Sequence, residues 1–130
     1  MAAPYSLQLV PKEGYLHALI GGENTPEVTR RYVRELIDAC RSANCPAVLV
    51  EEHLEGPRMR SGELFWIIQE LHADFRSAIQ LAAFVDASAE RSDDNMRFVE
   101  DASVNRGAGV AGFRTVAEAE AWLRAQLSKP

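Results

Sequence analysis

The sequence has no long hydrophobic run, and its start does not show the pattern of a signal peptide. Hydrophobic residues make up 47% of the chain, yet no segment reaches the ~18 consecutive apolar residues that suggest a membrane-spanning helix. The first residues, Met1–Tyr5, lack a basic region followed by an apolar stretch. We therefore expect a cytoplasmic protein without a membrane span.

Positive charge is also scarce. The 14 lysine and arginine residues are outnumbered by 19 aspartate and glutamate residues, so the formal net charge at pH 7 is −5. Proteins that bind nucleic acid usually carry a basic stripe. The composition therefore argues against a nucleic-acid partner, and the acidic balance favours solubility.

Only two cysteines are present, Cys40 and Cys45. Their spacing matches neither a zinc-binding nor a redox-active motif, and no HxxE or HxH pattern offers other metal ligands. Cys40 falls on the apolar face of a predicted helix, and Cys45 lies just before a predicted strand. We expect both to be buried as small hydrophobic side chains, and we predict no metal and no cofactor.

Linkers, internal repeats and low-complexity segments are absent as well. The length of 130 residues fits one domain and is long enough to bury a single core. We therefore predict one domain over residues 1–130.

The beginning of the chain predicts a β-hairpin. Tyr5–Val10 alternates apolar and polar residues, and Gly14–Ile20 forms a second short run. Pro11–Gly14 between them has the composition of a turn. Gly21–Asn24 then breaks the chain, so we expect the second strand to end there.

Two predicted helices have clear start signals. Thr25 can cap a helix that has Pro26 in its first position, where the missing N–H costs nothing, and apolar residues at helical spacing extend this helix to about Ala43. Near the end of the chain, Thr115 and Glu118 form a capping box, in which each side chain satisfies a backbone donor of the other residue.

Strands and helices alternate through the rest of the chain. Apolar runs predict strands over Ala47–Glu52, Ala78–Val85 and Gly109–Phe113, and helical spacing predicts helices over Ser61–Phe75 and within Ser88–Asn105. Continuous apolar strands are typical of sheets covered by helices on both faces. The alternation implies right-handed crossovers. We predict an α/β fold with an open, mostly parallel sheet, built from βα units and an N-terminal hairpin whose first strand is an antiparallel edge.

A hairpin followed by βα units ends here in Phe113–Leu123, where a short strand runs into a helix that closes with Trp122-Leu123. This pattern resembles the STAS domain of the anti-sigma-factor antagonists, and especially the broader SpoIIAA-like group of mostly uncharacterised bacterial proteins. The resemblance covers most of the chain. It implies a regulatory module that binds a protein partner.

In the antagonist family, a serine at the start of the second helix is phosphorylated by a partner kinase, and the phosphoryl group breaks the binding to that partner. The family's pattern there is an acidic residue, one or two small hydroxyl residues and then glycine. Ser61-Gly62 matches the end of this pattern, whereas Met59 and Arg60 occupy the positions of the acidic residue and its neighbour. The resemblance thus makes Ser61 a candidate phosphoacceptor.

The residues around Ser61 also have two interpretations that need no family. Serine is among the commonest N-cap residues, so its hydroxyl can simply accept from a backbone N–H of the first helical turn. Alternatively, the helix N-terminus at Gly62 and the guanidinium groups of Arg58 and Arg60 can bind an anion or a partner. A phosphoryl group on Ser61 would then lie at the favourable end of the helix dipole.

The second predicted helix carries a tryptophan in an unusual place. Its core face is formed by residues that recur at helical spacing: Leu64, Ile67, Ile68, Leu71 and Phe75. At about 100° per residue, Trp66 lies opposite that face, beside Gln69, Glu70 and Ala73. Aromatic residues are enriched at protein interfaces. We predict that Trp66 docks a partner or a second copy of the chain, unless a loop or a terminal helix covers it.

Polar side chains gather at the predicted carboxyl ends of the central strands: Glu51, Glu52, His53, Asp86 and Arg114. Open α/β sheets bind ligands at this edge, so a small anionic or lipid-like ligand, which related folds hold, is the alternative function. Adjacent strand residues point to opposite faces, so Glu51 and Glu52 cannot serve one site. His17 and His72 have no evident chemical partner.

A catalytic site requires a nucleophile, a base and oxyanion donors together, and the sequence does not offer that set. We therefore predict a non-enzymatic regulatory or protein-interaction module of STAS type. It acts through the second helix and the loop before it, with Ser61, Arg58, Arg60, Gly62 and Trp66 as the candidate site residues.

Overall fold

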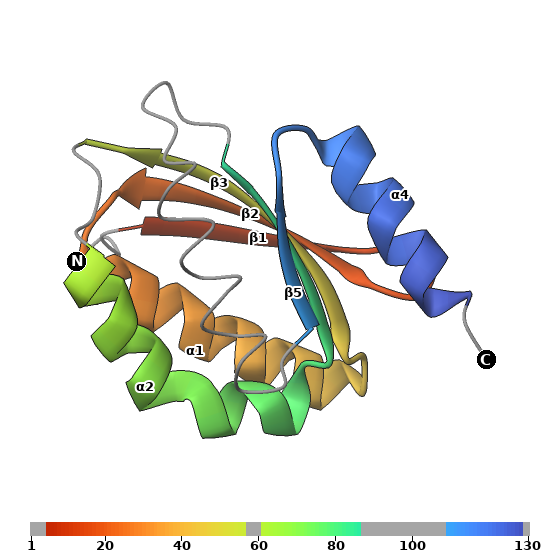
Figure 1. Ribbon diagram of the computed structural model, residues 1–130, viewed down its shortest axis with the longest axis horizontal. Coiled ribbons are helices and arrows are strands. Elements are labelled where there is room, and N and C mark those ends of the chain that lie inside the picture. The colour runs from red at the N-terminus through yellow and green to blue at the C-terminus, as the bar shows by residue number, and fades with distance from the viewer. Residues whose placement is uncertain (1–4, 57–60, 87–108, 129–130) are drawn as a thin grey trace.

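The structure, a computed structural model, describes residues 5–56, 61–86 and 109–128. The strands are β1 (Tyr5–Pro11), β2 (Leu16–Glu23), β3 (Ala47–Glu55), β4 (Leu81–Asp86) and β5 (Gly109–Phe113), and the helices are α1 (Pro26–Ala43), α2 (Ser61–Ala78) and α4 (Val116–Leu127). Together they form three layers, with α1 and α2 on one face of the sheet and α4 on the other (Figure 1).

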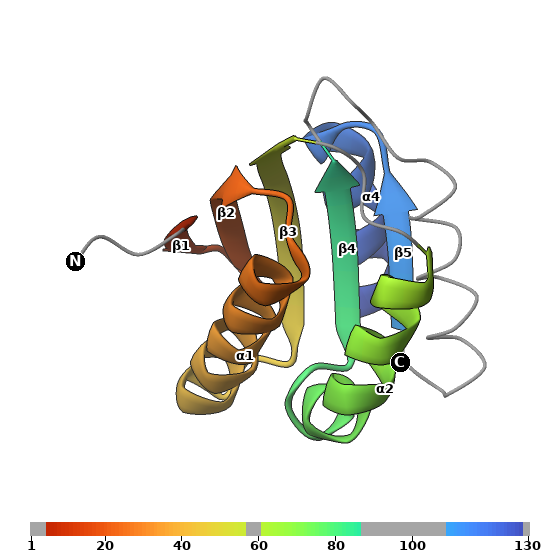
Figure 2. The same ribbon diagram turned by 90° about the vertical axis from the view of Figure 1, so that its left-hand side faces the viewer.

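The five strands lie in the order β1-β2-β3-β4-β5. β1 runs antiparallel to β2, and every other neighbouring pair is parallel, as the common direction of the arrows in Figure 2 shows for β2 to β5. The sequence-based prediction of an α/β fold with a mostly parallel sheet and an N-terminal hairpin is confirmed.

Buried apolar side chains fill both sides of the sheet. On β3, Val48 and Val50 belong to the core beneath α1, whereas Ala47 and Leu49 belong to the core beneath α4. The alternation follows from the two-residue period of a strand. Because both faces are covered, β3 is apolar without interruption over these four positions.

The predicted start signals of the helices are present. The Thr25 hydroxyl accepts from the Val28 N–H at 3.2 Å, and Pro26 follows as the first helical residue. At α4, the Thr115 hydroxyl accepts from the Glu118 N–H at 3.2 Å. In a full capping box the glutamate side chain accepts from the backbone N–H of the N-cap residue. Here the Glu118 carboxylate accepts from the side-chain hydroxyl of Thr115 at 3.1 Å.

The predicted break at Gly21–Asn24 is wrong for its first three residues, because β2 continues to Glu23. Gly21 and Gly22 pair with Ser6 and Tyr5 on β1 and with His53 and Leu54 on β3. Two neighbouring strands therefore supply hydrogen-bond partners for the backbone of this segment. At Gly22 φ is 138°, a conformation that glycine adopts without a steric penalty.

The boundary between α2 and β4 also lies later than predicted. The Ile79 N–H donates to the Phe75 carbonyl at 2.7 Å, which continues the helical bonding past Phe75, and the N–H groups of Gln80 and Leu81 both donate to the Pro46 carbonyl. Ile79 is buried in the core at this corner, so it resembles a strand residue in the sequence. The helix predicted within Ser88–Asn105 lies outside the described residues.

Candidate partner-binding surface

α2 presents its tryptophan to solvent. The Trp66 side chain is 67% exposed, and Gln69, Glu70 and Ala73 on the same side of the helix are exposed as well. The predicted orientation of Trp66 is therefore confirmed.

The opposite face of α2 packs on the protein. Ile67 and Leu71 are buried, the latter with only 2% exposure, and they contact Val33 of α1. Phe75 is half-buried and packs against the core beneath α1. These three positions agree with the predicted core face, and the side chains of Leu64 and Ile68 lie outside the described residues.

Two arginines of α1 contact one glutamate of α2 beside Trp66. Arg30 Nε lies 3.2 Å from Glu70 Oε1, and Arg34 Nη2 lies 3.3 Å from Glu70 Oε2. Glu70 is one helical turn from Trp66 on the same side of α2. The pairs are exposed and stabilise the fold little, and two guanidinium groups share one carboxylate at these contacts.

The candidate residues at the start of α2 are only partly described. α2 begins at Ser61, while Arg58, Arg60 and the side chain of Ser61 lie outside the described residues. Gly62 is exposed, and a Cβ atom added there would meet no heavy atom within 4 Å. Neither a close backbone approach nor a positive φ requires glycine at this position.

Gly62→Ala should therefore raise the free energy of unfolding by ~0.5–1 kcal/mol, because alanine loses less backbone entropy in a helix than glycine. Urea denaturation of the wild type and the variant measures the difference. A destabilisation of more than about 1 kcal/mol would show that Gly62 has a packing role that the open space around it does not reveal.

Glu51 and Glu52 point to opposite faces of the sheet, as predicted. Glu52 lies on the α1 side, where the Tyr32 hydroxyl donates to its Oε2 atom. Its strand neighbour in register is Asp86 at the end of β4. Burial raises the pKa of Glu52 to about 7; the hydrogen bond from Tyr32 opposes this effect and the charge of Asp86 adds to it.

Glu51 lies on the α4 side between two histidines. Its Oε1 atom is 2.9 Å from His17 Nε2 on β2, and its Oε2 atom is 2.5 Å from His53 Nε2. Burial by itself would raise the pKa of Glu51, but the hydrogen bonds to His53 and His17 outweigh it, so the pKa is lowered. The expectation that His17 has no partner is wrong, because β2 and β3 bring together residues that are far apart in sequence.

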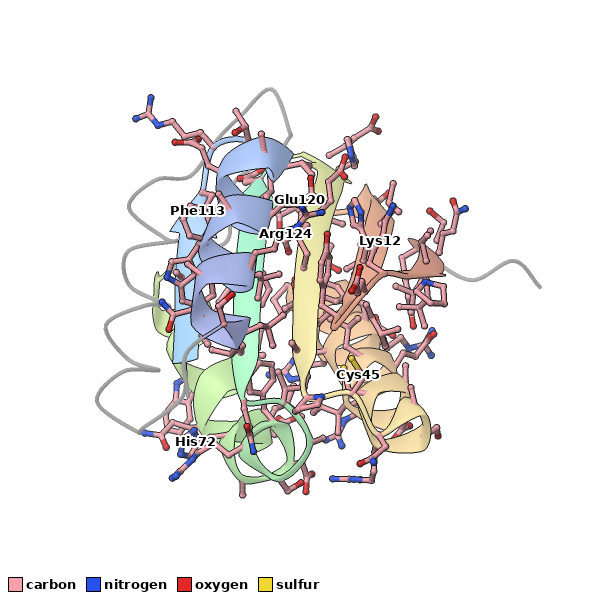
Figure 3. The ribbon with its side chains drawn as sticks, turned by 90° about the vertical axis from the view of Figure 1, so that its right-hand side faces the viewer. Lys12, Cys45, His72, Phe113, Glu120 and Arg124 are labelled. Carbon is pink, nitrogen blue, oxygen red and sulfur yellow. The ribbon has the colours of Figure 1, made fainter. Side chains whose placement is uncertain are left out.

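A second cluster holds α4 against the sheet. The buried Tyr15 donates its hydroxyl to Glu120 Oε2 at 2.6 Å, and Arg124 Nη2 lies 3.8 Å from the same oxygen. Figure 3 shows Glu120 and Arg124 on the face of α4 that overlooks β3. Burial and the hydrogen bond to Glu120 raise the pKa of Tyr15, which keeps the phenol protonated. These residues serve the packing of α4.

The described part of the chain holds neither a cluster of metal ligands nor a helix that could span a membrane. Within residues 5–56, 61–86 and 109–128, no three histidine, cysteine, aspartate or glutamate side chains are grouped so that they could hold a metal ion. In the same ranges, no helix is long and apolar enough to cross a membrane. His72 is half-buried on α2 (Figure 3).

No family model matches the sequence, and no curated protein matches it. Among solved structures, the crystal structure of an anti-sigma factor antagonist from Mycobacterium paratuberculosis superposes with a TM-score of 0.55. The match covers 95% of this chain and 99% of that chain at 15% sequence identity. This chain has a STAS-like fold. At such low identity the likeness concerns the fold, and it confirms the fold resemblance predicted from the sequence.

Proposed function

We propose that this protein is a non-enzymatic regulatory module of STAS type, which binds a protein partner through the outer face of α2 and the loop before it. The observation that carries the proposal is the exposed Trp66 on the outer face of α2. The STAS-like fold supports it, since the structural neighbour is named as an anti-sigma factor antagonist. That name describes the neighbour, and this chain's partner is a matter for experiment.

The size of the tryptophan explains why it dominates this surface. A tryptophan buries ~150–250 Å² when it is fully covered. With two thirds of it exposed, a partner that covers Trp66 gains roughly 3 kcal/mol from apolar burial. Interface hot spots are enriched in tryptophan and arginine, and here Arg30 and Arg34 contact Glu70, which lies one helical turn from Trp66.

The loop before α2 gives this surface a means of regulation. A phosphoryl group on Ser61 would add negative charge at the positive end of the α2 dipole, one turn from Trp66. Arg58 and Arg60 precede it in the sequence and can pair with such a group. Ser61→Asp, which places a carboxylate there, is the variant that imitates this change.

Affinity capture from the source lysate tests the proposal. The bait proteins are the wild type, Trp66→Ala and Leu127→Ala, where Leu127 is an exposed apolar residue of α4 on the other side of the sheet. We expect one specific partner, or a second copy of the chain, to be retained by the wild type and by Leu127→Ala and lost by Trp66→Ala. Equal retention by all three baits, or no specific partner with any of them, would contradict the proposal.

The alternative function, a small anionic or lipid-like ligand at the carboxyl ends of the strands, has less support. Glu51 and Asp86 lie at this edge, and their carboxylates oppose the approach of an anion. The protein-interaction proposal is therefore the one we advance.

A further inference from the structure

The C-terminus of α1 brings the two cysteines of the chain together. Asn44 adopts the left-handed conformation with φ of 52°, and its N–H donates to the Arg41 carbonyl at 3.2 Å. The Cys45 N–H donates to the Cys40 carbonyl, five residues back, at 2.9 Å. These bonds define a Schellman motif, in which the residues in the positions of Cys40 and Cys45 commonly make a side-chain contact.

The surroundings of the two thiols agree with such a contact. Cys40 is 1% exposed in the core beneath α1, and the half-buried Cys45 packs against the same core. A disulfide needs Cα atoms ~4.4–6.8 Å apart, and the bond from the Cys45 N–H to the Cys40 carbonyl holds the two backbones next to each other. The Cys45 thiol now faces the carbonyls of Ala47 and Gly14 at 3.6 and 3.8 Å, and bonds from a thiol are weak.

We propose that Cys40 and Cys45 form a reversible intramolecular disulfide, which closes the end of α1 in the presence of a low-molecular-weight disulfide such as oxidised glutathione. This modification goes beyond the proposed partner binding and does not depend on it. Cys40 is buried, as expected from the sequence, whereas Cys45 is only half-buried; the proposal adds a chemical role to the pair.

The environments of the thiols determine the order of the steps. Burial, with a smaller contribution from Cys45, raises the pKa of Cys40 to about 11, so Cys40 is protonated at neutral pH and reacts second. The half-buried Cys45 thiolate attacks one sulfur of oxidised glutathione, the S–S bond breaks, and one glutathione leaves as a thiolate that takes up a proton.

Cys40 then attacks the Cys45 sulfur of the mixed disulfide, the bond from Cys45 to glutathione breaks, and the departing glutathione thiolate takes up the Cys40 proton. In total, the two protein thiols lose two electrons and two protons, and oxidised glutathione gains them as two thiols. Reduced glutathione in excess reverses both steps.

The test uses the folded full-length chain in buffers with a series of ratios of reduced to oxidised glutathione. After acid quenching, the chain is unfolded in denaturant at a pH that restores the thiolates, and the remaining thiols are alkylated. Intact-mass spectrometry and peptide mapping follow. We expect the wild type to change from two alkylated cysteines to none, with a mass lower by two hydrogens, no retained glutathione, and one peptide linked through Cys40 and Cys45.

Two variants make the outcome decisive. Cys40→Ala should retain one glutathione on Cys45, because no second thiol resolves the mixed disulfide, and Cys45→Ser should leave Cys40 unmodified and alkylated only after denaturation. If Cys40→Ala fails to fold, the results for the wild type and Cys45→Ser still decide whether the disulfide forms. A wild type that retains glutathione on Cys45, links two chains through Cys45, or stays fully alkylated at every ratio would overturn the proposal.

Discussion

Replacing Leu123 with alanine should lower the free energy of unfolding by about 2 to 5 kcal/mol. Leu123 is 0% exposed. Together with Ala119 it packs in the core between α4 and the sheet, which also contains Leu49 and Val85. Truncation removes buried apolar atoms and leaves a cavity between two rigid layers, which relaxes only in part. Urea denaturation, followed by circular dichroism, gives the midpoint and the slope from which this free energy is obtained.

Leu127→Ala is the matched control for this measurement. Leu127 belongs to the same helix, four residues further on, but it is 41% exposed. Its truncation should cost less than about 1 kcal/mol. If Leu123→Ala costs no more than Leu127→Ala, α4 is not packed on the sheet in the way described here.

Glu52→Gln should remove a pH dependence of stability. The pKa of Glu52 in the folded chain, about 7, lies above the ordinary value of 4.5. Between these values the folded chain holds a proton that the unfolded chain has released. Ionisation of Glu52 therefore lowers the free energy of unfolding progressively as the pH rises from 4.5 to 7. Above pH 7 the total loss is up to about 3 kcal/mol. The glutamine cannot ionise, yet its amide oxygen can still accept from Tyr32.

Denaturation of the wild type and Glu52→Gln at a series of pH values from 4 to about 8.5 checks this prediction. We expect the variant to be the more stable protein at the alkaline end and the difference to shrink toward the acid end. The adjacent Glu51 is the control, because its pKa is lowered and its contribution is lost as the pH falls through that lowered value. Glu51→Gln should therefore reduce stability at neutral pH, and the same sign for both variants would contradict the assignment of the two faces.

Much of the fold follows from local patterns. Thr25 and Pro26 place the start of α1 correctly, because capping and the geometry of proline act within one helical turn. The exposure of Trp66 follows equally directly from the angular step of a helix and the apolar residues on its other side. Where the structure depends on residues that are close in sequence, the sequence alone is sufficient to predict it.

Other features depend on residues that meet only in the folded chain. Gly21 and Gly22 suggest a break until β1 and β3 are seen to pair with them on both sides. His17 and Glu51 are hydrogen-bonded although 34 residues separate them. Such pairs follow from strand register, which a single sequence does not specify.

The candidate surface combines both kinds of feature. Trp66 was predictable from the sequence of α2, whereas the contacts of Arg30 and Arg34 with Glu70 require the packing of α1 against α2. No local motif links those arginines to the tryptophan. The charge around Glu70, which bears on the choice of a partner, therefore emerged only from the structure.

Fluorine NMR of the chain labelled with 5-fluorotryptophan tests the central claim most directly. The chain has two tryptophans, so two signals are expected. Trp122 packs against Phe113 with ring centroids 5.7 Å apart, and the variant Trp122→Phe assigns the signals. The captured partner is added without label, so only the two indoles of this chain are observed.

We expect the Trp66 signal to shift as the partner saturates the chain, while the Trp122 signal stays in place. If the partner is a second copy, the same shift should appear with rising concentration of the chain. A Trp66 signal that does not move at saturation, with binding shown independently, would contradict the claim that this protein recognises its partner through the outer face of α2.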